Sequence, residues 1–317
     1  MLGAPAITAG IAVLTLAAAL PLALTVRSAL ASHLGSSLVA DRLLDGWDVG
    51  WAGEFSAQAR GVATTFTHEI LGFGGTLATI SGVLDDVPPN PVVAAAATFY
   101  VALWVFLSGG ILDRFARNRA IRAAAFFSAC GVYFVRFLRL AIVIGLCYWA
   151  LFRWLHPWLF DRLWDRWTRD LTSESTALLL RIGLYAVFAA ALMLVSLVAD
   201  FAKVRAVVED RRSMLGALVS SARFIRRRRW RVTGLYLLNS LAAVLIAALW
   251  MWADPPAAWP PWLALAVGQL YIVGRLAAKL AFMASEIVFF QDELAHAHYT
   301  AAPEPVWPDS PAVESIR

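Results

Sequence analysis

The sequence predicts an all-α membrane protein, a polytopic helix bundle with about six transmembrane helices. Apolar residues make up 60% of the 317 residues and charged residues only 15%, whereas soluble chains are nearer half apolar and a quarter charged. Several apolar runs also reach the ~20 residues that a helix needs to cross a bilayer. These observations exclude a disordered chain, a collagen-like chain and an ordinary soluble enzyme.

Six apolar runs are long enough to span, and they lie at 7–26, 91–112, 140–160, 177–199, 232–253 and from 262 towards 298. Pro91 suits the first turn of a helix. We interpret the first run as a retained anchor because no Lys or Arg precedes it, and cleavage after Ala31 is the alternative. Together the runs predict a single membrane domain over 1–299, followed by an extended cytoplasmic tail over 300–317, which contains four prolines.

The charges between the runs predict orientation. Segments 113–139 and 200–231 contain six and ten Lys/Arg, whereas 28–90, 161–176 and 254–261 are acidic or neutral. Basic loops stay on the cytoplasmic side, so we expect both termini to be cytoplasmic, in a bacterial inner membrane. Topology then explains the net charge of +5, and we expect no nucleic-acid partner.

The segment 28–90 is predicted to form an outer loop. Its part 62–84 is nearly apolar and long enough to span, but a seventh span would move the N-terminus to the other side. We therefore expect a re-entrant or interfacial element packed on the bundle, since irregular backbone at membrane depth must be covered by protein.

The two basic segments resemble each other. Residues 122–139 align without gaps on 212–229, and four positions then coincide: Arg122/Arg212, Phe134/Phe224, Arg136/Arg226 and Arg139/Arg229. Because each segment joins two spans, this similarity predicts an internal repeat of span, amphipathic in-plane helix and span. The alternative is that any two basic membrane loops look alike.

The sixth run contains a candidate polar seam. Residues at three- and four-residue steps share one helix face, and this face includes Arg275, Lys279 and Glu286. A cation in hydrocarbon costs roughly 2.5–3.5 kcal/mol. The seam therefore either faces the bundle interior, where it could bind an anion or pair with acids, or its cations reach the headgroups. Glu286 is expected at the interface.

A run of arginines before the fifth span is the candidate site for lipid or a partner. Clusters of basic residues beside a membrane helix attract anionic lipid, at about 1 kcal/mol per charge. We expect membrane lipids, or a protein partner at the cytoplasmic face, to bind here, and the alternative is that these charges serve topology alone. The candidates are Arg226, Arg227, Arg228, Arg229 and Arg231.

Three weaker candidates lie elsewhere. His68-Glu69 is half of a metalloprotease motif, but position 72 is Gly and not the second His. Arg181 lies about one turn inside the fourth run, where it either pairs with an outer acid such as Glu69 or reaches outward to the headgroups.

The remaining sequence predicts no metal, cofactor or catalytic site. His296 and His298 have no third ligand nearby. Cys130 and Cys147 are too far apart for a paired site and are predicted to be core residues. No Walker loop, dinucleotide fingerprint or Gly-x-Ser-x-Gly elbow occurs.

Several strings together resemble an uncharacterised family of bacterial multi-pass membrane proteins over nearly the whole chain. The layout of span, amphipathic helix and span also resembles the membrane domains attached to some bacterial glycerophosphodiester phosphodiesterases. Neither resemblance supplies catalytic residues, and this chain has no phosphodiesterase domain. The strings are 65–67, 109–114, 156–161, 200–205 with 209–212, and 305–308.

The first functional hypothesis is a non-enzymatic membrane subunit or scaffold that binds anionic lipid or a cytoplasmic partner. The alternative is a transporter or permease for an anionic or lipid-like substrate, motivated by Arg275, Lys279 and the predicted repeat. A third, an intramembrane enzyme using His68 and Glu69, lacks an identifiable third catalytic group.

Overall fold

The computed structural model describes residues 4–35, 37–39, 48–66, 80–118, 122–253 and 260–296, and these ranges contain helices but no strand. Among them, five helices are long and apolar enough to cross a membrane: α1 (Ala4–Leu34), α5 (Pro91–Ala116), α6 (Ala123–Ala150) with its extension, α8 (Glu174–Val208) and α10 (Arg229–Ala253). The all-α class is confirmed. The sixth predicted span corresponds to α11 (Pro261–His296), which is not among the five, so the count of six stays a prediction.

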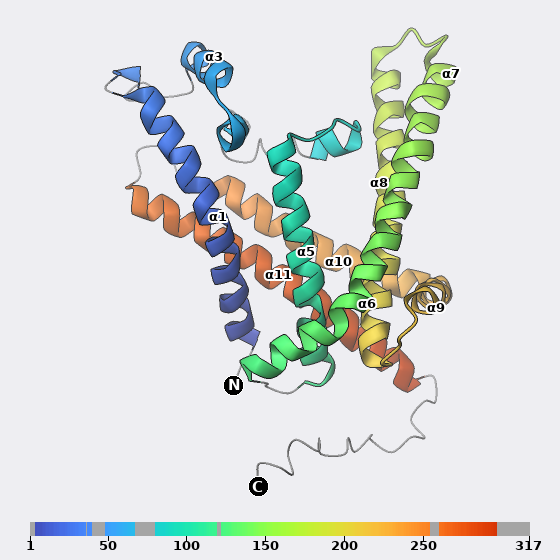
Figure 1. Ribbon diagram of the computed structural model, residues 1–317. Helices are drawn as coiled ribbons and strands as arrows, with labels where there is room; N and C mark the ends of the chain where they lie inside the picture. The colour runs from blue at the N-terminus through green and yellow to red at the C-terminus, as the bar shows by residue number, and fades with distance from the viewer. Residues whose placement is uncertain are drawn as a thin grey trace.

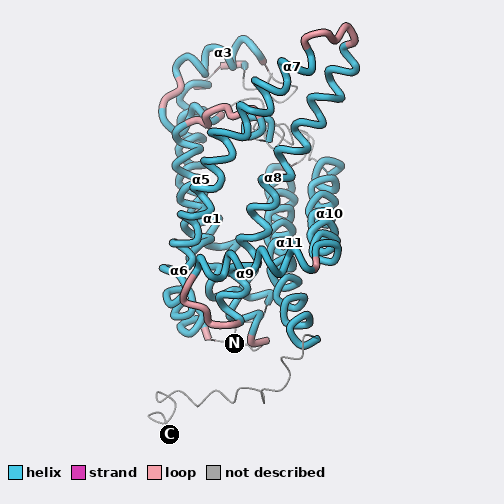
Figure 2. Tube along the Cα trace, turned by 90° about the vertical axis from the view of Figure 1, so that its right-hand side faces the viewer, coloured by secondary structure: helices cyan, strands magenta, loops and turns pink. Residues whose placement is uncertain are grey.

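The helices lie between two ends of the molecule (Figure 1). One end, which we call the α7 end, contains the short helices α3 (Val49–Gln58) and α7 (Trp164–Thr168). The opposite α9 end contains α9 (Met214–Arg227), the last turn of α5, the start of α6 and the last turns of α11. Figure 2 shows α5, α6 and α8 extending between these ends, whereas α10 and α11 cross the molecule obliquely in Figure 1.

Helix α6 is longer than the sequence predicted. It continues through two π-helical segments, η3 (Leu151–Leu155) and η4 (Trp158–Leu163), into α7. Pro157 lies between these segments, and because it has no N–H for the regular ladder, wider turns accommodate it. The predicted outer loop at 161–176 is therefore helical as far as Thr168.

Helix α6 also begins earlier than predicted. Helix α5 continues to Ala116 and α6 starts at Ala123, so most of the loop predicted over 113–139 is helical. The first part of α6 runs across the molecule before the helix turns upward beside α8 (Figure 1). Its N-terminal half stays helical because a stripe of side chains on one face is buried: Phe126, Cys130, Tyr133 and Phe137. The in-plane helix expected here is thus continuous with the following span.

The second basic segment contains a separate amphipathic helix. Helix α8 ends at Val208, and Asp210 adopts a positive φ of 46° in the turn that leads to α9. The N–H of Arg211 donates to the carbonyl of Ala206 at 3.1 Å, which is the long bond of a Schellman motif. Helix α9 then packs against α8 and buries one face, formed by Met214, Ala217, Ser221, Phe224 and Ile225.

Two glycines allow α5 and α6 to pack closely. A Cβ atom at Gly110 would lie 2.6 Å from Sγ of Cys130 and 2.8 Å from the carbonyl oxygen of Phe126. A Cβ atom at Gly109 would lie 2.8 Å from Cβ of Tyr133. Membrane helices associate through such small residues because lipid gives no hydrophobic drive for their contact.

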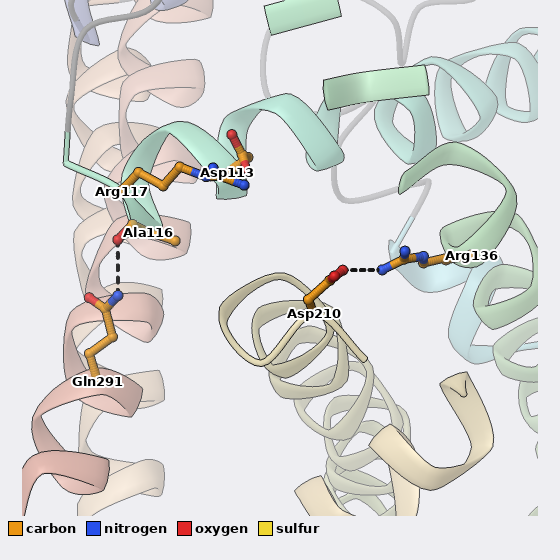
Figure 3. Close-up of polar contacts among 6 residues, drawn as sticks. All are labelled: Asp113, Ala116, Arg117, Arg136, Asp210 and Gln291. Carbon is orange, nitrogen blue, oxygen red and sulfur yellow. Dashed lines mark hydrogen bonds and ion pairs between the residues drawn. The ribbon is translucent and has the colours of Figure 1, made fainter. Parts of the chain in front are cut away.

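Polar contacts connect the helices at the α9 end (Figure 3). Arg136 of α6 pairs with Asp210 at 2.7 Å, and Nε2 of Gln291 in α11 donates to the carbonyl of Ala116 at 3.0 Å. Ala116 is the last residue of α5, so this amide satisfies a carbonyl that has no partner within its own helix. Asp113 and Arg117 form an ion pair one turn apart at 2.8 Å.

Gly110 lies in close contact with α6. Substitution of Gly110 by Ala should destabilise the protein by about 1–3 kcal/mol, because the added methyl group would collide with the α6 backbone, which cannot move aside easily. The control is Gly131→Ala on α6, where a Cβ atom meets nothing within 4 Å. The control should be neutral or slightly stabilising, since Ala favours a helix over Gly by roughly 0.5–1 kcal/mol. Thermal unfolding of both variants in lipid nanodiscs measures the difference, and equal midpoints would contradict the close contact.

Candidate functional site

A cluster of polar side chains, of which Glu286 is buried and the others are half-buried, lies between α8, α10 and α11. Helix α8 contributes Asp200 and Lys203, which form an ion pair at 2.5 Å one turn apart. Helix α11 contributes Glu286, which interacts electrostatically with Asp200 and Lys203. Tyr236 of α10 lies close enough for the two carboxylates to act on its hydroxyl group. We call Asp200, Lys203, Glu286 and Tyr236 the polar cluster.

Glu286 is the most deeply buried acid of the cluster. Its residue is only 2% exposed, and its Oε1 atom has no hydrogen-bond partner among the described residues. Its neighbours Ile287 and Phe290 belong to the main apolar core. We expected Glu286 at the membrane interface. The structure buries it inside the bundle, where α8 and α10 both pack against α11, and its depth relative to the membrane interface stays a prediction.

Hydroxyl groups border the polar cluster. Tyr148 of α6 and Ser196 of α8 share a hydrogen bond of 2.6 Å. Between α10 and α11, Nδ2 of Asn239 donates to Oγ of Ser285 at 2.9 Å, and the Ser285 hydroxyl donates to the carbonyl of Phe282 at 2.7 Å. Four helices therefore supply hydrogen-bonding groups around one buried region.

The other residues of the predicted seam have aromatic partners. The Lys279 ammonium lies 3.4 Å from the ring centroid of Trp104 and 5.4 Å from that of Tyr100. The Arg275 guanidinium lies 5.5 Å from the ring centroid of Tyr271 on its own helix. Such cation–π contacts offset part of the cost of a poorly hydrated charge. Arg275, Lys279 and Glu286 thus occupy three different environments along α11.

The predicted arginine run divides into two groups. Arg228 and Arg231 both pair with Glu293 near the end of α11, Arg231 at 2.7 Å. Hydrogen bonds, first from Arg228, lower the pKa of the Glu293 carboxyl below its ordinary value. Arg226, Arg227 and Arg229 are exposed, as Arg231 is, but form no ion pair among the described residues. Arg229 lies over the ring of Trp230 at 5.4 Å, and Trp230 is itself 78% exposed.

Arg181 pairs with an acid at the α7 end. Its Nε donates to the hydroxyl of Tyr185 at 3.1 Å, and its Nη2 lies 3.6 Å from Oδ1 of Asp85. Tyr185 in turn donates to Asp85. The expected partner Glu69 lies outside the described residues, as does His68, so the suggested intramembrane enzyme stays untested. The described acid Asp85 takes the role that we expected of an outer acid.

The segment that contains Asp85 docks onto the α6–α8 hairpin. Nε2 of His156 lies 2.9 Å from the carbonyl oxygen of Leu84, and the His156 ring packs among Phe152, Phe160 and Phe188. The Tyr185 hydrogen bond and the Arg181 charge lower the pKa of the Asp85 carboxyl, although desolvation opposes them. Part of the predicted outer segment is therefore fixed to the bundle by polar contacts.

The two cysteines lie in different environments. Cys130 is fully buried, as predicted, whereas Cys147 is exposed, so the prediction of a core position is wrong there. Within the described ranges no three His, Cys, Asp or Glu side chains are placed to hold a metal ion. His298 and the tail over 300–317 lie outside those ranges.

Sequence reasoning missed most of the polar cluster. It assigned Asp200 and Lys203 to a cytoplasmic loop because the apolar run ends at Ala199. The spacing of three residues was a usable signal, because it places an acid and a base on one helix face. Tyr148, Ser196 and Tyr236 gave no signal, since single hydroxyl groups are common in apolar runs and their meeting depends on the packing of three helices.

Comparisons of the chain with protein-family models, with curated proteins and with solved structures gave no match. The resemblances drawn from sequence strings therefore stay predictions.

The contacts of Asp85 lead to a prediction about pH. Asp85→Asn should weaken the docking of 80–87 by about 1 kcal/mol or less, the usual value for an exposed pair, and should speed hydrogen exchange there. A carboxyl with a lowered pKa stabilises the fold above its unfolded pKa, so this contribution holds at neutral pH and fades as the pH falls below 3.8.

Hydrogen exchange followed by mass spectrometry at pH 7 and near the acid limit of stability checks this. Wild type and Asp85→Asn should differ at neutral pH and converge in acid. The matched control is Asp86→Asn, because Asp86 has a positive φ of 55° that Asn tolerates. Equal exchange of wild type and Asp85→Asn at neutral pH would show that the Asp85 contacts contribute nothing to docking.

Proposed function

We propose that this protein is a non-enzymatic membrane subunit or scaffold that binds anionic phospholipid headgroups at its α9 end. One observation carries the proposal: Arg226, Arg227 and Arg229 are exposed beside the exposed Trp230, at the junction between the amphipathic helix α9 and the apolar helix α10. Tryptophan favours the headgroup layer, and cations there attract anionic lipid. A protein partner at the same face is the other expected ligand.

The ion pairs of the arginine run support this assignment. Glu293 compensates Arg228 and Arg231 within the protein, so these two arginines hold α11 to the start of α10. The exposed arginines remain available for phosphate oxygens, which the planar guanidinium group binds in bidentate fashion. The run therefore contains two arginines that stabilise the fold and three that remain available to a ligand.

Replacing Arg226, Arg227 and Arg229 together by Gln should reduce binding of anionic lipid, by about 1 kcal/mol for each charge removed. Native mass spectrometry of the protein released from nanodiscs of phosphatidylglycerol and phosphatidylcholine gives the retained lipids directly. The matched control replaces three exposed arginines at the α7 end, Arg162, Arg166 and Arg169. Equal retention of phosphatidylglycerol by both triple variants would contradict the proposal.

The same extraction distinguishes a lipid scaffold from a protein subunit. A stoichiometric protein that copurifies with wild type and is lost from the α9-end variant would assign the arginines to that partner. Phosphatidylglycerol retained without any such protein would assign them to lipid.

A second candidate function is a carrier for an anionic or lipid-like substrate. Its support is the polar cluster, since ionisable groups inside a membrane bundle commonly mark transport pathways; Arg275 and Lys279 lie at exposed positions of α11, where they could attract an anionic substrate. Arg275→Ala should then slow transbilayer movement of fluorescent phosphatidylglycerol in proteoliposomes. The control is Val273→Ala on the same helix, and unchanged movement in Arg275→Ala, or none in wild type, would count against a lipid carrier.

A further inference from the structure

We propose that Glu286 is a proton-binding site, at which the buried carboxyl group takes up and releases one exchangeable proton. The inference goes beyond lipid binding at the α9 end and does not depend on it. It rests on the burial of Glu286, on the unpartnered Oε1 atom and on the charges of the groups that surround it.

The charges of the polar cluster do not balance when every group is ionised. Lys203 supplies one positive charge and is held by Asp200 at 2.5 Å. Glu286 then adds a second carboxylate, which leaves the cluster with one net negative charge. Lys279, the next cation along α11, lies over Trp104 and Tyr100; its charge interacts with those of Asp200 and Lys203, but the charges that act on Glu286 are those of Asp200 and Lys203. A proton on Glu286 makes the cluster neutral.

Hydrogen bonding leads to the same conclusion. An ionised carboxylate needs donors to replace water, and leaving it buried without them costs several kcal/mol. No donor to Oε1 of Glu286 occurs among the described residues. A protonated carboxyl group has a much smaller desolvation cost, so the site as observed suits the neutral acid.

Two charged neighbours act on the carboxyl group of Glu286, and two phenols lie in the same region. Asp200 disfavours ionisation of Glu286 and Lys203 favours it, both from α8. Tyr236 of α10 faces the two carboxylates, and Tyr148 of α6 lies beyond it. Both phenols are neutral near pH 7. Of the two charged neighbours, only Lys203 favours the charged form of Glu286, and Asp200 already pairs with Lys203.

The proposed step is a simple proton transfer. When water reaches the site, the O–H bond of Glu286 breaks, the proton passes to water as hydronium, and a carboxylate remains. The reverse step restores the neutral acid, and no other bond changes. If the protein is a carrier, this site makes the proton its coupling ion.

Infrared difference spectroscopy of the full-length protein in nanodiscs tests the proposal. At neutral pH nearly all ordinary carboxyl groups are ionised, so a C=O stretching band of a protonated acid identifies an exceptional group. We expect wild type to show this band, to lose it as the pH is raised, and to shift it to lower frequency in D2O. Glu286→Gln should lack the band.

The matched control is Glu293→Gln, which changes the same residue type on the same helix and should keep the band. If Glu286→Gln does not fold, Glu286→Asp should show the band at a different frequency. No band in wild type, or a band that persists in Glu286→Gln, would overturn the proposal; if that persisting band is lost in a folded Asp200→Asn variant, the proton belongs to Asp200. Stabilisation of a fully ionised wild type by added sodium would also overturn it and would assign the site to a metal cation.

Discussion

The fold depends on how the charged end of α8 is accommodated inside an apolar assembly. This end contains Asp200, Lys203 and Arg205, and the chain around it is largely buried. Burial of a charge is tolerated only where a partner or a hydrogen bond compensates it. Asp200 compensates Lys203, and Glu209 pairs with Arg205 at 3.2 Å. These pairs let α8 continue as one helix to the turn that starts α9.

The position of that turn determines the arrangement of the α9 end. Asp210 adopts the left-handed conformation that ends α8, and its carboxylate also pairs with Arg136. The turn therefore connects α6 to the α8–α9 corner, while Glu293 connects α11 to the start of α10. Gly109 and Gly110 allow α5 to approach α6 at the same end. The α9 end thus holds the helices together. The ion pairs of Arg228 and Arg231 with Glu293 also fix the position of the exposed arginines beside them.

Some parts of the candidate site could be predicted from the sequence. The arginine run was visible because repeated cations beside an apolar run are typical of the cytoplasmic headgroup layer. Glu286 was visible as an acid on the helix face that it shares with Lys279, although its burial was not. Arg181 was recognised as a cation needing an acid, but the acid is Asp85, which is almost a hundred positions away in sequence. Its choice depends on how 80–87 docks onto the α6–α8 hairpin.

The sequence by itself determined the all-α class, the apolar helices able to cross a membrane, and the clustering of arginines before α10. Composition and run length suffice for these features, because the bilayer requires long apolar helices. Only the tertiary structure decided that α6 begins at Ala123, that the arginine run divides into paired and exposed residues, and that Glu286 is buried beside Asp200 and Lys203. The physical reason is that a charge is stable where another helix brings its partner, and that meeting is a property of packing between distant segments.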